Sequence, residues 1–452
     1  MTRKLFGTDG IRGVANRGAM TPEVAFRVGA AIVHQARKRL KHPPRVIIGK
    51  DTRISGYMLE TALASGVCAW GGQVILTGPL PTPAIAHLVS SMRADAGVVL
   101  SASHNEFPDN GIKVFGADGF KLPDETEAEL ERLIASDALD HGRPEGAKVG
   151  VAERLDDAGG RYITFVKQTF PDDLTLEGLK VVVDAAHGAA YKVAPTVFEE
   201  LGAEVFPIGV RPTGTNINQK CGAVHPSACA AEVKKRKADV GIALDGDADR
   251  VIVIDQGGNE VDGDRVMGLC AIRMLKERRL AKKTLVATVM SNLGLERAIE
   301  EAGGKMVRTA VGDRYVVEAM RKGGYNLGGE QSGHVIFLDH ASTGDGLVAA
   351  LQVLAMVRRE GKPLSELARH VMTRVPQVLV NATLAARKPL EQMPRTTKAM
   401  RSAEKELGKK GRLVVRWSGT EPKLRVMVEG ENEARIRALA DAIAAEAARD
   451  VA

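Results

Sequence analysis

Three stretches of the chain repeat one pattern of hydrophobic and polar positions. Each begins with an apolar run of strand length, continues through a polar turn into an amphipathic helical pattern, and ends with a second apolar run. The three stretches are residues 45–78, 179–209 and 283–312. Each helix is expected to end at a pair of small residues, as helix C-termini prefer: Gly71-Gly72, Gly202-Ala203 and Gly303-Gly304. The repeated pattern is a βαβ unit, and it predicts three similar α/β domains with mostly parallel sheets.

The pattern changes from about Arg374 onward. A strand-like run at 374–384 is followed by a charged helical pattern, by two β-rich runs at 411–417 and 423–430, and by an alanine-rich helical pattern from about Glu431. This order predicts a smaller C-terminal α+β domain with an antiparallel sheet. The expected domain ranges are 1–155, 156–257, 258–372 and 373–452.

Composition restricts the class of protein. A chain of 452 residues is too long for one core, and no apolar stretch reaches the roughly 18 residues that a membrane span needs. Two basic residues near the start precede no apolar segment, and the four cysteines lack metal-binding spacing, so we expect a cytoplasmic protein with no secretory signal. The net charge of +7, with only 4% aromatic residues, favours a small anionic substrate over nucleic acid.

An apolar run at 97–100 stops abruptly at a group of polar residues. The group consists of Ser101, Ser103, His104 and Asn105, and a turn-rich stretch then leads to Lys113. Ligands bind at strand ends in α/β proteins, so the pattern indicates a site. A polar turn in which Ser and Asn satisfy backbone groups is the alternative.

Three aspartates alternate with two small residues after another apolar run: Asp245, Gly246, Asp247, Ala248 and Asp249. We expect the extended chain to bring the three carboxylates together, and three oxygens at one point are typical of a site for a hard divalent cation. An acidic surface turn is disfavoured, because the carboxylates would repel one another without a cation.

The same segment differs from a calcium-binding EF-hand. Arg250 occupies the place of the loop glycine, Gln256 occupies the place of the final glutamate, and a strand precedes the loop. Magnesium bound by carboxylates favours a phosphate oxygen as a further ligand, and Arg250 can balance the charge. The segment therefore predicts phosphoryl transfer.

Two further segments carry weaker signals. After two glycines, Glu330, Ser332 and His334 alternate in a pattern that would point them to one side, which suits recognition of hydroxyl or amine groups. A turn between the two β-rich runs near the C-terminus contains a possible anion site: Arg416, Ser418, Gly419, Thr420 and Arg425. Taken alone, the first segment could equally be an ordinary turn, and for the second an ordinary surface β-turn is the favoured alternative.

Five motifs together resemble, in order and spacing, the signatures of the α-D-phosphohexomutases. They are GTDGIRG at 7–13, SASHN at 101–105, DGDADR at 245–250, GEQSGH at 329–334 and RWSGTEP at 416–422. The segments NINQKCGA at 216–223 and VGDRYV at 311–316, together with Gln331, resemble the branch of this family that acts on glucosamine phosphate. The resemblance implies four domains around a central cleft.

The resemblance also implies an activity, which is the interconversion of glucosamine 6-phosphate and glucosamine 1-phosphate. The product would feed UDP-N-acetylglucosamine and cell-wall precursor synthesis. Ser103 would carry the transferred phosphate, and glucosamine 1,6-bisphosphate would be the intermediate. The metal would be one Mg²⁺, with four ligands: Ser103, Asp245, Asp247 and Asp249.

The family pattern assigns the remaining site residues. Arg12 and Lys113 would lie beside the phosphate, and the sequence does not choose between His104 and Lys113 as the group that transfers the proton. The substrate-binding residues would be Arg250, Thr309, Glu330, Ser332, His334, Arg416, Ser418, Gly419, Thr420 and Arg425. The expected partner is a sugar phosphate, with a homodimer possible and with neither nucleic acid nor membrane involved.

Three positions depart from the family pattern, namely Glu106, His187 and Trp417. None of them replaces a named ligand, so they bear on rate and specificity. A mutase for glucose or mannose phosphates and a non-catalytic sugar-phosphate-binding protein are the alternatives. A haloacid-dehalogenase-like phosphatase does not fit, because its nucleophilic aspartate lies in the first strand of the fold.

Overall fold

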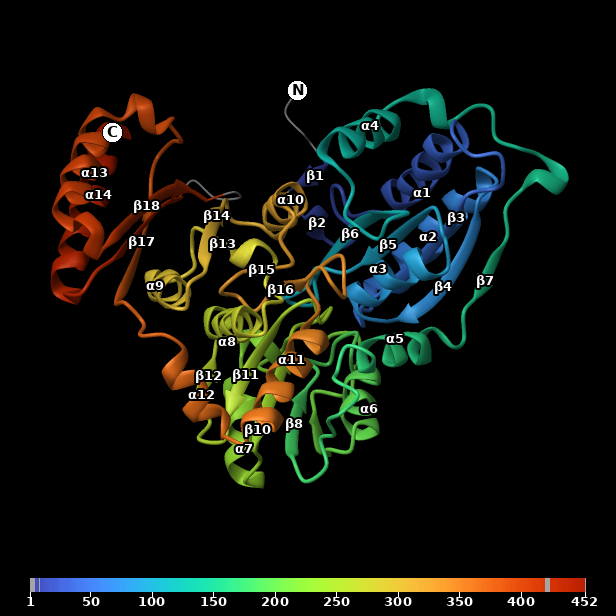
Figure 1. Ribbon diagram of the computed structural model, residues 1–452. Helices are drawn as coiled ribbons and strands as arrows, with labels where there is room; N and C mark the ends of the chain where they lie inside the picture. The colour runs from blue at the N-terminus through green and yellow to red at the C-terminus, as the bar shows by residue number, and fades with distance from the viewer. Residues whose placement is uncertain (1–4, 8, 419–422, 452) are drawn as a thin grey trace.

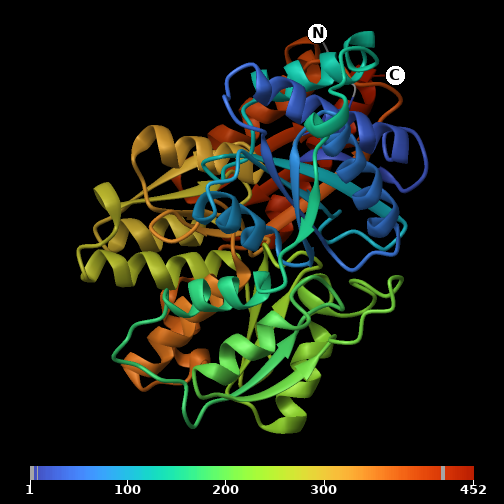
Figure 2. The ribbon, with the colours of Figure 1, turned by 90° about the vertical axis from the view of Figure 1, so that its right-hand side faces the viewer.

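The computed structural model describes residues 5–7, 9–418 and 423–451, and these form four units that follow one another along the chain (Figure 1). Each unit is built on one sheet, of seven, five, four and three strands respectively. The first and last units lie at the two ends of the arrangement in Figure 1, and the second unit lies at the bottom in both Figure 1 and Figure 2. The prediction of three α/β domains and a smaller α+β domain is confirmed.

The first sheet has the strand order β1-β2-β6-β5-β3-β4-β7. Its strands are β1 (Phe6–Gly7), β2 (Gly10–Val14), β3 (Arg45–Lys50), β4 (Gln73–Pro79), β5 (Ala96–Leu100), β6 (Asp109–Gly116) and β7 (Ala152–Arg154). Its helices are α1 (Pro22–Arg37), α2 (Ser55–Ala69), α3 (Thr82–Ser91) and α4 (Asp124–Ile134). Val46 and Val98 pack with α1 and α2, whereas the alternate residues Ile47 and Val99 pack with α3. Burial on both faces explains the continuous apolar runs of β3 and β5.

The second sheet has the order β12-β11-β10-β8-β9, and the third has the order β14-β13-β15-β16. The strands of the second are β8 (Lys180–Asp184), β9 (Glu204–Ile208), β10 (Val240–Leu244), β11 (Val251–Asp255) and β12 (Glu260–Val261). Those of the third are β13 (Thr284–Thr288), β14 (Lys305–Thr309), β15 (Leu327–Gly329) and β16 (Val335–Phe337). The accompanying helices are α5 (Ala158–Lys167), α6 (Val193–Glu200), α7 (Ser227–Arg236), α8 (Gly263–Lys276), α9 (Leu293–Glu301), α10 (Asp313–Gly323), α11 (Gly346–Glu360) and α12 (Leu364–Val371).

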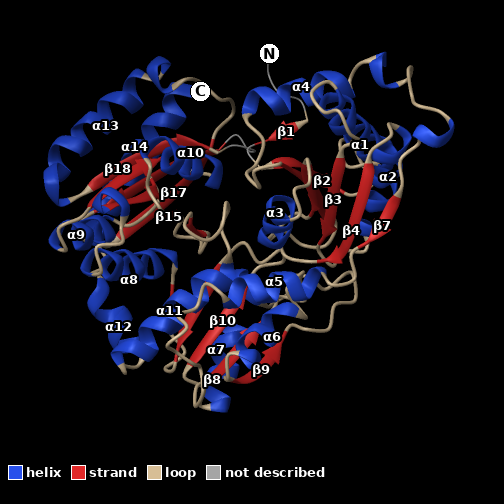
Figure 3. Cartoon of the chain, turned by 45° about the vertical axis from the view of Figure 1, so that its right-hand side comes forward, coloured by secondary structure: helices blue, strands red, loops and turns tan. Residues whose placement is uncertain are grey.

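The last sheet is antiparallel, in the order β17-β19-β18. Its strands are β17 (Gln377–Thr383), β18 (Arg412–Trp417) and β19 (Lys423–Glu429). The helices α13 (Pro394–Leu407) and α14 (Glu433–Val451) pack on this sheet with their own hydrophobic core (Figure 3). The separate core matches the change of pattern seen in the sequence after Arg374.

The three predicted βαβ units are present, and their strands pair in parallel: β3 with β4, β8 with β9, and β13 with β14. The glycines expected at the helix ends have left-handed backbones, with φ of 78° at Gly71, 99° at Gly202 and 82° at Gly303. Only glycine adopts this conformation without steric cost, which explains why each helix stops there.

Each of the first three sheets is mixed, because its parallel part continues into an antiparallel hairpin. The hairpins join β5 to β6, β10 to β11, and β15 to β16, and the last sheet has an equivalent hairpin between β18 and β19. Three of the four segments with chemical signals lie at these hairpin connections, at residues 101–108, 245–250 and 330–334. The fourth begins at Ser418, after the end of β18, and continues into residues outside the described ranges. A hairpin returns the chain within a few residues, so polar side chains stay together at the end of a buried strand.

Candidate active site

Ser103 lies in the connection between β5 and β6, and its side chain is buried against the second domain. Its Oγ donates a hydrogen bond of 2.5 Å to Oδ2 of Asp245 and lies 3.5 Å from Nδ1 of His104. The backbone of Ser103 has a positive φ of 52°. A residue other than glycine is disfavoured there by about 1 to 2 kcal/mol, so the surrounding contacts must stabilise this conformation.

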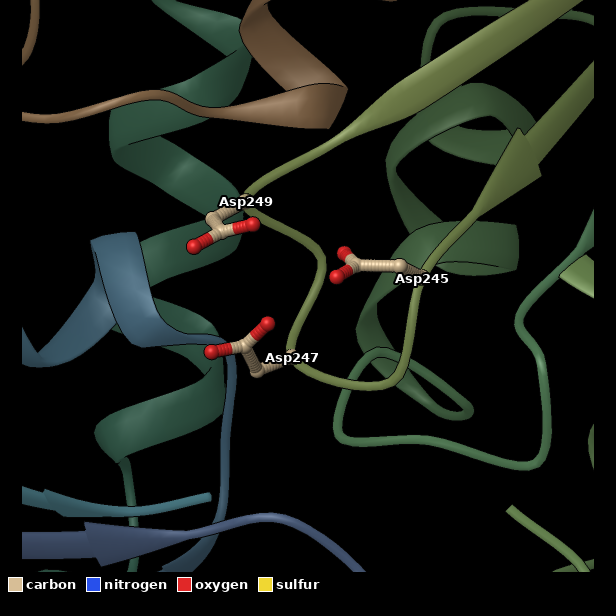
Figure 4. A group of neighbouring side chains, drawn as sticks. All are labelled: Asp245, Asp247 and Asp249. Carbon is tan, nitrogen blue, oxygen red and sulfur yellow. The ribbon is translucent and has the colours of Figure 1, made fainter. Parts of the chain in front are cut away.

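The three aspartates lie on one tight turn. Ala248 has a φ of 57°, and its N–H donates to the carbonyl of Asp245, so the prediction of an extended chain is wrong for this segment. The turn nevertheless directs the three carboxylates into one space (Figure 4), with one oxygen of each within 4.8 Å of the others. A side chain at Gly246 would meet the carbonyl oxygen of Ser103 at 2.6 Å, so the close approach of the two segments requires glycine there.

The carboxylates of this turn are buried, and the pKa values of Asp245 and Asp249 shift in opposite directions. Burial and repulsion from Asp249 and Asp247 raise the pKa of Asp245 well above its ordinary value. Burial alone would also raise the pKa of Asp249, but Lys113 and His334 bring it well below its ordinary value. Burial and repulsion thus disfavour the charged form of Asp245, whereas the neighbouring cations favour the charged form of Asp249.

The side chains fit a divalent cation. Among the described residues, Oδ1 of Asp247 and Oδ1 of Asp249 are buried oxygens without a hydrogen-bond partner. Unsatisfied buried carboxylate oxygens are costly, and a hard cation is the ligand that removes this cost. The residues present therefore suit Mg²⁺.

Lys113, on β6, lies beside the same turn. Its Nζ is 2.8 Å from Oδ2 of Asp247 and 3.4 Å from carboxylate oxygens of both Asp249 and Asp9. Burial alone would lower the pKa of Lys113, but Asp247, Asp9 and Asp249 raise it well above the ordinary value. Lys113 is therefore a fixed cation at neutral pH and is poorly suited to accept a proton.

Arg12 and Asp9 extend the charged site toward the third domain. Arg12 forms an ion pair with Asp9, and Asp9 also pairs with Lys121, whose Nζ lies 2.5 Å from Oδ2 of Asp313. Burial would raise the pKa of Asp9, but the three neighbouring cations, Lys113 first among them, hold it well below its ordinary value. Lys121 and Asp313 thus connect the first domain to the start of α10.

His104 is half-buried beside Ser103. Burial, followed by the positive charges of Arg250 and Arg12, lowers the pKa of His104 to about 4. The imidazole is therefore neutral near pH 7, with a ring nitrogen that can accept a proton.

The connection between β15 and β16 is a second tight turn, at Gly333. Glu330 accepts hydrogen bonds from the N–H of Gly312 at 2.9 Å and from Oγ of Ser332 at 3.3 Å. His334 instead is buried, and its Nδ1 lies 3.5 Å from Oδ1 of Asp249. The prediction that Glu330, Ser332 and His334 point to one side through strand alternation is therefore wrong, because a turn replaces the extended chain.

Arg250 contacts two of the three aspartates, whereas the side chain of Thr309 contacts its neighbour along the chain. The N–H of Arg250 donates to Oδ1 of Asp245 at 3.2 Å, and the guanidinium lies 3.8 Å from Asp249. Burial would lower the pKa of Arg250, but Asp249, Asp245 and Glu330 raise it. Thr309 ends β14 and donates to the carbonyl of Ala310, and within the described ranges no hydrogen bond joins its side chain to another predicted site residue.

Arg416 and Arg425 lie directly opposite each other on β18 and β19. In the described part of the chain, Nε of each is buried without a hydrogen-bond partner. Burial and repulsion from Arg425 lower the pKa of Arg416, and Glu330 is close enough to oppose this effect. Ser418 is buried and starts the connection, whereas Gly419 and Thr420 lie outside the described residues. Two facing guanidinium groups suit a bound anion such as phosphate.

The positions that depart from the family pattern lie at the margins of the site. The side chain of Glu106 is exposed, and that of His187 accepts a hydrogen bond from the N–H of Arg211. Trp417 donates from Nε1 to the carbonyl of Lys388 at 2.8 Å. None of these contacts involves the three aspartates.

The sequence analysis missed four buried residues that support the site: Asp51, Arg53, Thr82 and Asn218. Oγ1 of Thr82 donates to Oδ2 of Asp247 at 2.6 Å, and Asn218 donates to the carbonyls of Ser103 and Asn105. Thr82 precedes a proline at the start of α3, where a helix start alone explains the residue. The polar segment KDTR after β3 was the one available signal for Asp51 and Arg53.

Comparison with known proteins identifies the protein family to which this chain belongs. Family models described as phosphoglucomutase/phosphomannomutase match in chain order: the α/β/α domain I at residues 3–140, domain II at 160–258, domain III at 262–375, and the C-terminal domain at 379–446. The chain belongs to the phosphoglucomutase/phosphomannomutase family, and the resemblance inferred from the five motifs is confirmed.

Within this family, the similarity is to enzymes that act on an amino sugar. The chain is 64% identical to a phosphoglucosamine mutase of Sorangium cellulosum over 450 residues, covering 100% of this chain and 94% of the relative. It is 59% identical to a phosphoglucosamine mutase of Syntrophotalea carbinolica over 444 residues, covering 98% and 97%. A solved structure of a family protein from Burkholderia thailandensis is 26% identical, with a TM-score of 0.81 and coverage of 98% and 97%. The predicted similarity to the glucosamine-phosphate branch is confirmed.

In the described ranges, no helix has both the length and the apolar composition needed to cross a membrane.

Proposed function

We propose that this protein interconverts glucosamine 6-phosphate and glucosamine 1-phosphate, as its phosphoglucosamine mutase relatives are named for doing. The observation that carries the proposal is the position of Ser103 Oγ, 2.5 Å from Asp245 in a turn of three carboxylates. A hydroxyl group beside a divalent-cation site and fixed cations suits phosphoryl transfer, which depends mainly on positioning and charge neutralisation.

In the proposed reaction, Ser103 carries the phosphoryl group between turnovers. The bond from phosphorus to Ser103 Oγ breaks, and a new bond forms to the free hydroxyl of the sugar phosphate, which gives glucosamine 1,6-bisphosphate. The bisphosphate then turns in the site and returns its other phosphoryl group to Ser103. The Mg²⁺ on the three aspartates and Ser103 would neutralise charge on the transferred group.

Lys113 and Arg12 supply positive charge beside the transferred phosphoryl group in this proposal. Lys113 is buried and surrounded by carboxylates, and Nε of Arg12 has no hydrogen-bond partner within the described ranges, so it can bind an added anion. His104 is the better candidate for accepting the proton from the sugar hydroxyl, because its ring is neutral near pH 7 and its Nδ1 lies 3.5 Å from Oγ of Ser103, whereas Lys113 is held as a cation.

The distant groups of the substrate would contact the third and fourth domains. Glu330 and the exposed Ser332 suit the sugar hydroxyl or amine groups, and Arg250 with Thr309 and His334 would border them. The facing guanidinium groups of Arg416 and Arg425, with the segment from Ser418 through Gly419 and Thr420, would bind the phosphate that is not reacting. The homodimer remains a prediction, and the four free cysteines support the cytoplasmic location proposed from sequence.

A coupled assay tests the substrate. Glucosamine 6-phosphate, glucose 6-phosphate and mannose 6-phosphate are compared at equal concentration with Mg²⁺ and a trace of the matching bisphosphate. We expect the highest kcat/KM with glucosamine 6-phosphate, whereas a higher value with either of the other sugars would support a phosphoglucomutase or phosphomannomutase instead.

Replacement of the phosphate-carrying residue tests the mechanism. Ser103→Ala should lower turnover by about 10⁴-fold or more, because it removes the hydroxyl that carries the phosphoryl group in this proposal. Intact mass should show one phosphate on the wild-type chain and none on the variant, with an unchanged thermal midpoint. A phosphate that persists in Ser103→Ala would place the nucleophile elsewhere.

A further inference from the structure

Arg53 lies behind the segment that contains Ser103, and its side chain has no exposed surface. Its guanidinium donates to four backbone carbonyls of this segment, those of Ser103, Asn105, Glu106 and Asp109. The two carbonyls contacted through Nη2 are 3.0 Å and 2.8 Å away. One side chain thus donates to three carbonyls of the β5–β6 connection and to that of Asp109 at the start of β6.

Asp51 orients this guanidinium and also reaches Ser103 from its other side. Oδ2 of Asp51 accepts hydrogen bonds from Nε of Arg53 at 2.8 Å and from Oγ of Ser101 at 2.6 Å. Oγ of Ser101 in turn accepts from the N–H of Ser103 at 2.9 Å. The pair Asp51 and Arg53 therefore determines the direction of both the N–H and the carbonyl of Ser103.

This double contact matters because Ser103 has a positive φ, which an isolated serine seldom adopts. Rotation of the backbone toward the ordinary region would move Oγ away from Asp245. A guanidinium is planar and offers five N–H groups in a rigid fork, so it can donate to several carbonyls at once, and an ammonium group cannot do the same.

A second contact comes from the second domain. Nδ2 of Asn218 donates to the same two carbonyls, those of Ser103 and Asn105, at 2.8 Å and 2.9 Å. Asn218 thus supports the segment from the side of the three aspartates, and Arg53 supports it from the side of the first domain.

We propose that Arg53, oriented by Asp51, is a positioning residue that holds Ser103 in its left-handed conformation and so sets the rate at which Ser103 receives and donates the phosphoryl group. The inference rests on the proposed function, because Ser103 must be the phosphate carrier. Arg53 itself touches no substrate in this proposal.

The test compares Arg53→Lys with a matched control, Arg27→Lys. Arg27 also donates to two backbone carbonyls of the first domain, those of Ile134 and Ser136, and pairs with Asp140, but it lies apart from the Ser103 segment. For wild type and both variants, we would measure kcat, KM, the thermal midpoint, and the rate at which glucosamine 1,6-bisphosphate phosphorylates Ser103, followed by intact mass.

We expect Arg53→Lys to lower kcat and the phosphorylation rate by about the same factor, on the order of 10²-fold, with KM little changed, because a small displacement of reacting atoms is costly. The control should keep wild-type kcat even if its thermal midpoint falls. Hydrogen exchange should be faster at residues 101–109 in Arg53→Lys and unchanged there in Arg27→Lys.

Two results would overturn the inference in different ways, and a substitute variant decides if Arg53→Lys does not fold. If the wild type neither isomerises the sugar phosphate nor acquires phosphate on Ser103, the proposed function fails and the inference fails with it. If the wild type does both and Arg53→Lys keeps the control's kcat and phosphorylation rate, only the inference fails. If Arg53→Lys does not fold, Asn218→Ala decides: a loss of kcat and of phosphorylation rate of about tenfold at unchanged KM supports the inference, and unchanged rates refute it.

Discussion

The turn at 245–250 and the hairpin of β18 and β19 both present groups for phosphate chemistry, but they differ in how their charges are paired. The aspartates of the turn are buried, and Lys113 lies within 3.4 Å of both Asp247 and Asp249. On the hairpin, Arg416 and Arg425 face each other across the strands, and in the described part of the chain neither Nε has a hydrogen-bond partner. One region is organised by ion pairs within the protein, and the other has like charges that an anion would compensate.

Because of this difference, substitutions in the two regions should affect stability differently, although both should lower activity. Removing a paired buried charge leaves its partner without compensation and destabilises the fold, whereas removing one of two like charges relieves repulsion. In the first region, substitution of the paired cation should therefore lower stability as well as activity, whereas substitution of an aspartate that is repelled by its neighbours should lower activity alone. Substitutions in the second should lower substrate binding without loss of stability.

Lys113→Met should have the largest combined effect. It removes the cation shared by Asp247, Asp9 and Asp249, so we expect kcat to fall by about 10³-fold, since charge stabilisation at the reacting group is a large term. Loss of a buried partner should cost about 3 to 5 kcal/mol, which lowers the thermal midpoint of a domain of about 150 residues by roughly 6 to 20 °C. Calorimetry and steady-state assays below the transition would measure both effects, and unchanged stability would contradict the role of Lys113 as the paired cation.

Asp245→Asn should affect activity strongly and stability little. The pKa of Asp245 is raised by burial and by its neighbouring aspartates, so its negative charge opposes folding at neutral pH when no cation is bound. We expect about 10² to 10³-fold lower Mg²⁺-dependent activity, because a cation ligand is lost. In chelator the thermal midpoint should be equal to or above that of the wild type.

Addition of Mg²⁺ provides the control for Asp245→Asn. The wild type should gain thermal stability as Mg²⁺ is added, because a ligand that binds only the folded state stabilises it, and the variant should gain less. A variant that melts lower in chelator yet keeps its Mg²⁺-dependent activity would show that the three aspartates serve the fold and not the reaction.

The sequence predicted the aspartate turn well, because its chemistry depends on residues that are neighbours along the chain. The aspartates lie within five residues, and the three βαβ units are local patterns, so both could be inferred from spacing. The supporting residues could not, since their contacts cross the chain: Arg53 is 50 residues from Ser103, Asn218 is 115 from it, and Thr82 is 165 from Asp247. Only the fold brings these residues together.

The backbone conformation of the site segments was also harder to predict than which residues form the site. The turns at Ala248 and Gly333 replaced two stretches of expected extended chain, because tertiary contacts override a pattern of alternation. The sequence also left the choice between His104 and Lys113 open. Their pKa values depend on burial and on charges brought from other domains, and the low pKa of His104 against the high pKa of Lys113 is visible only in the fold.

Arg416→Ala tests the hairpin of β18 and β19, where two like charges face each other. We expect KM to rise about 10 to 100-fold, because a guanidinium that makes paired bonds to phosphate is lost. The thermal midpoint should stay the same or rise slightly, since Arg425 no longer faces a like charge. Single-turnover analysis with labelled phosphoenzyme should show more free glucosamine 1,6-bisphosphate per product formed. A fall in stability like that of Lys113→Met would remove the contrast between the two regions.

Arg416→Lys is the matched variant for this prediction. It keeps the positive charge but cannot form paired bonds to phosphate, so its KM should lie between those of the wild type and Arg416→Ala. Equal KM values for all three proteins, with equal release of bisphosphate, would mean that the distal phosphate binds elsewhere.

Trp417→Phe should have the smallest effect. It tests how far the hairpin of β18 and β19 depends on the contacts that hold it in place. The indole Nε1 of Trp417 donates to the carbonyl of Lys388 at 2.8 Å, and Arg387 donates to the carbonyl of Ser418 at 2.5 Å, so two contacts connect the 387–388 segment to the start of the phosphate-binding connection. Trp417 is half-buried, and water can replace the lost donor, so the change should cost about 1 kcal/mol or less. We expect KM to rise by about threefold at most, with kcat and bisphosphate release unchanged. A KM as high as that of Arg416→Ala would show that Trp417 determines the position of the phosphate-binding residues. The hairpin of β18 and β19 would then be held in place by contacts within the protein before substrate binds, as the aspartate turn is.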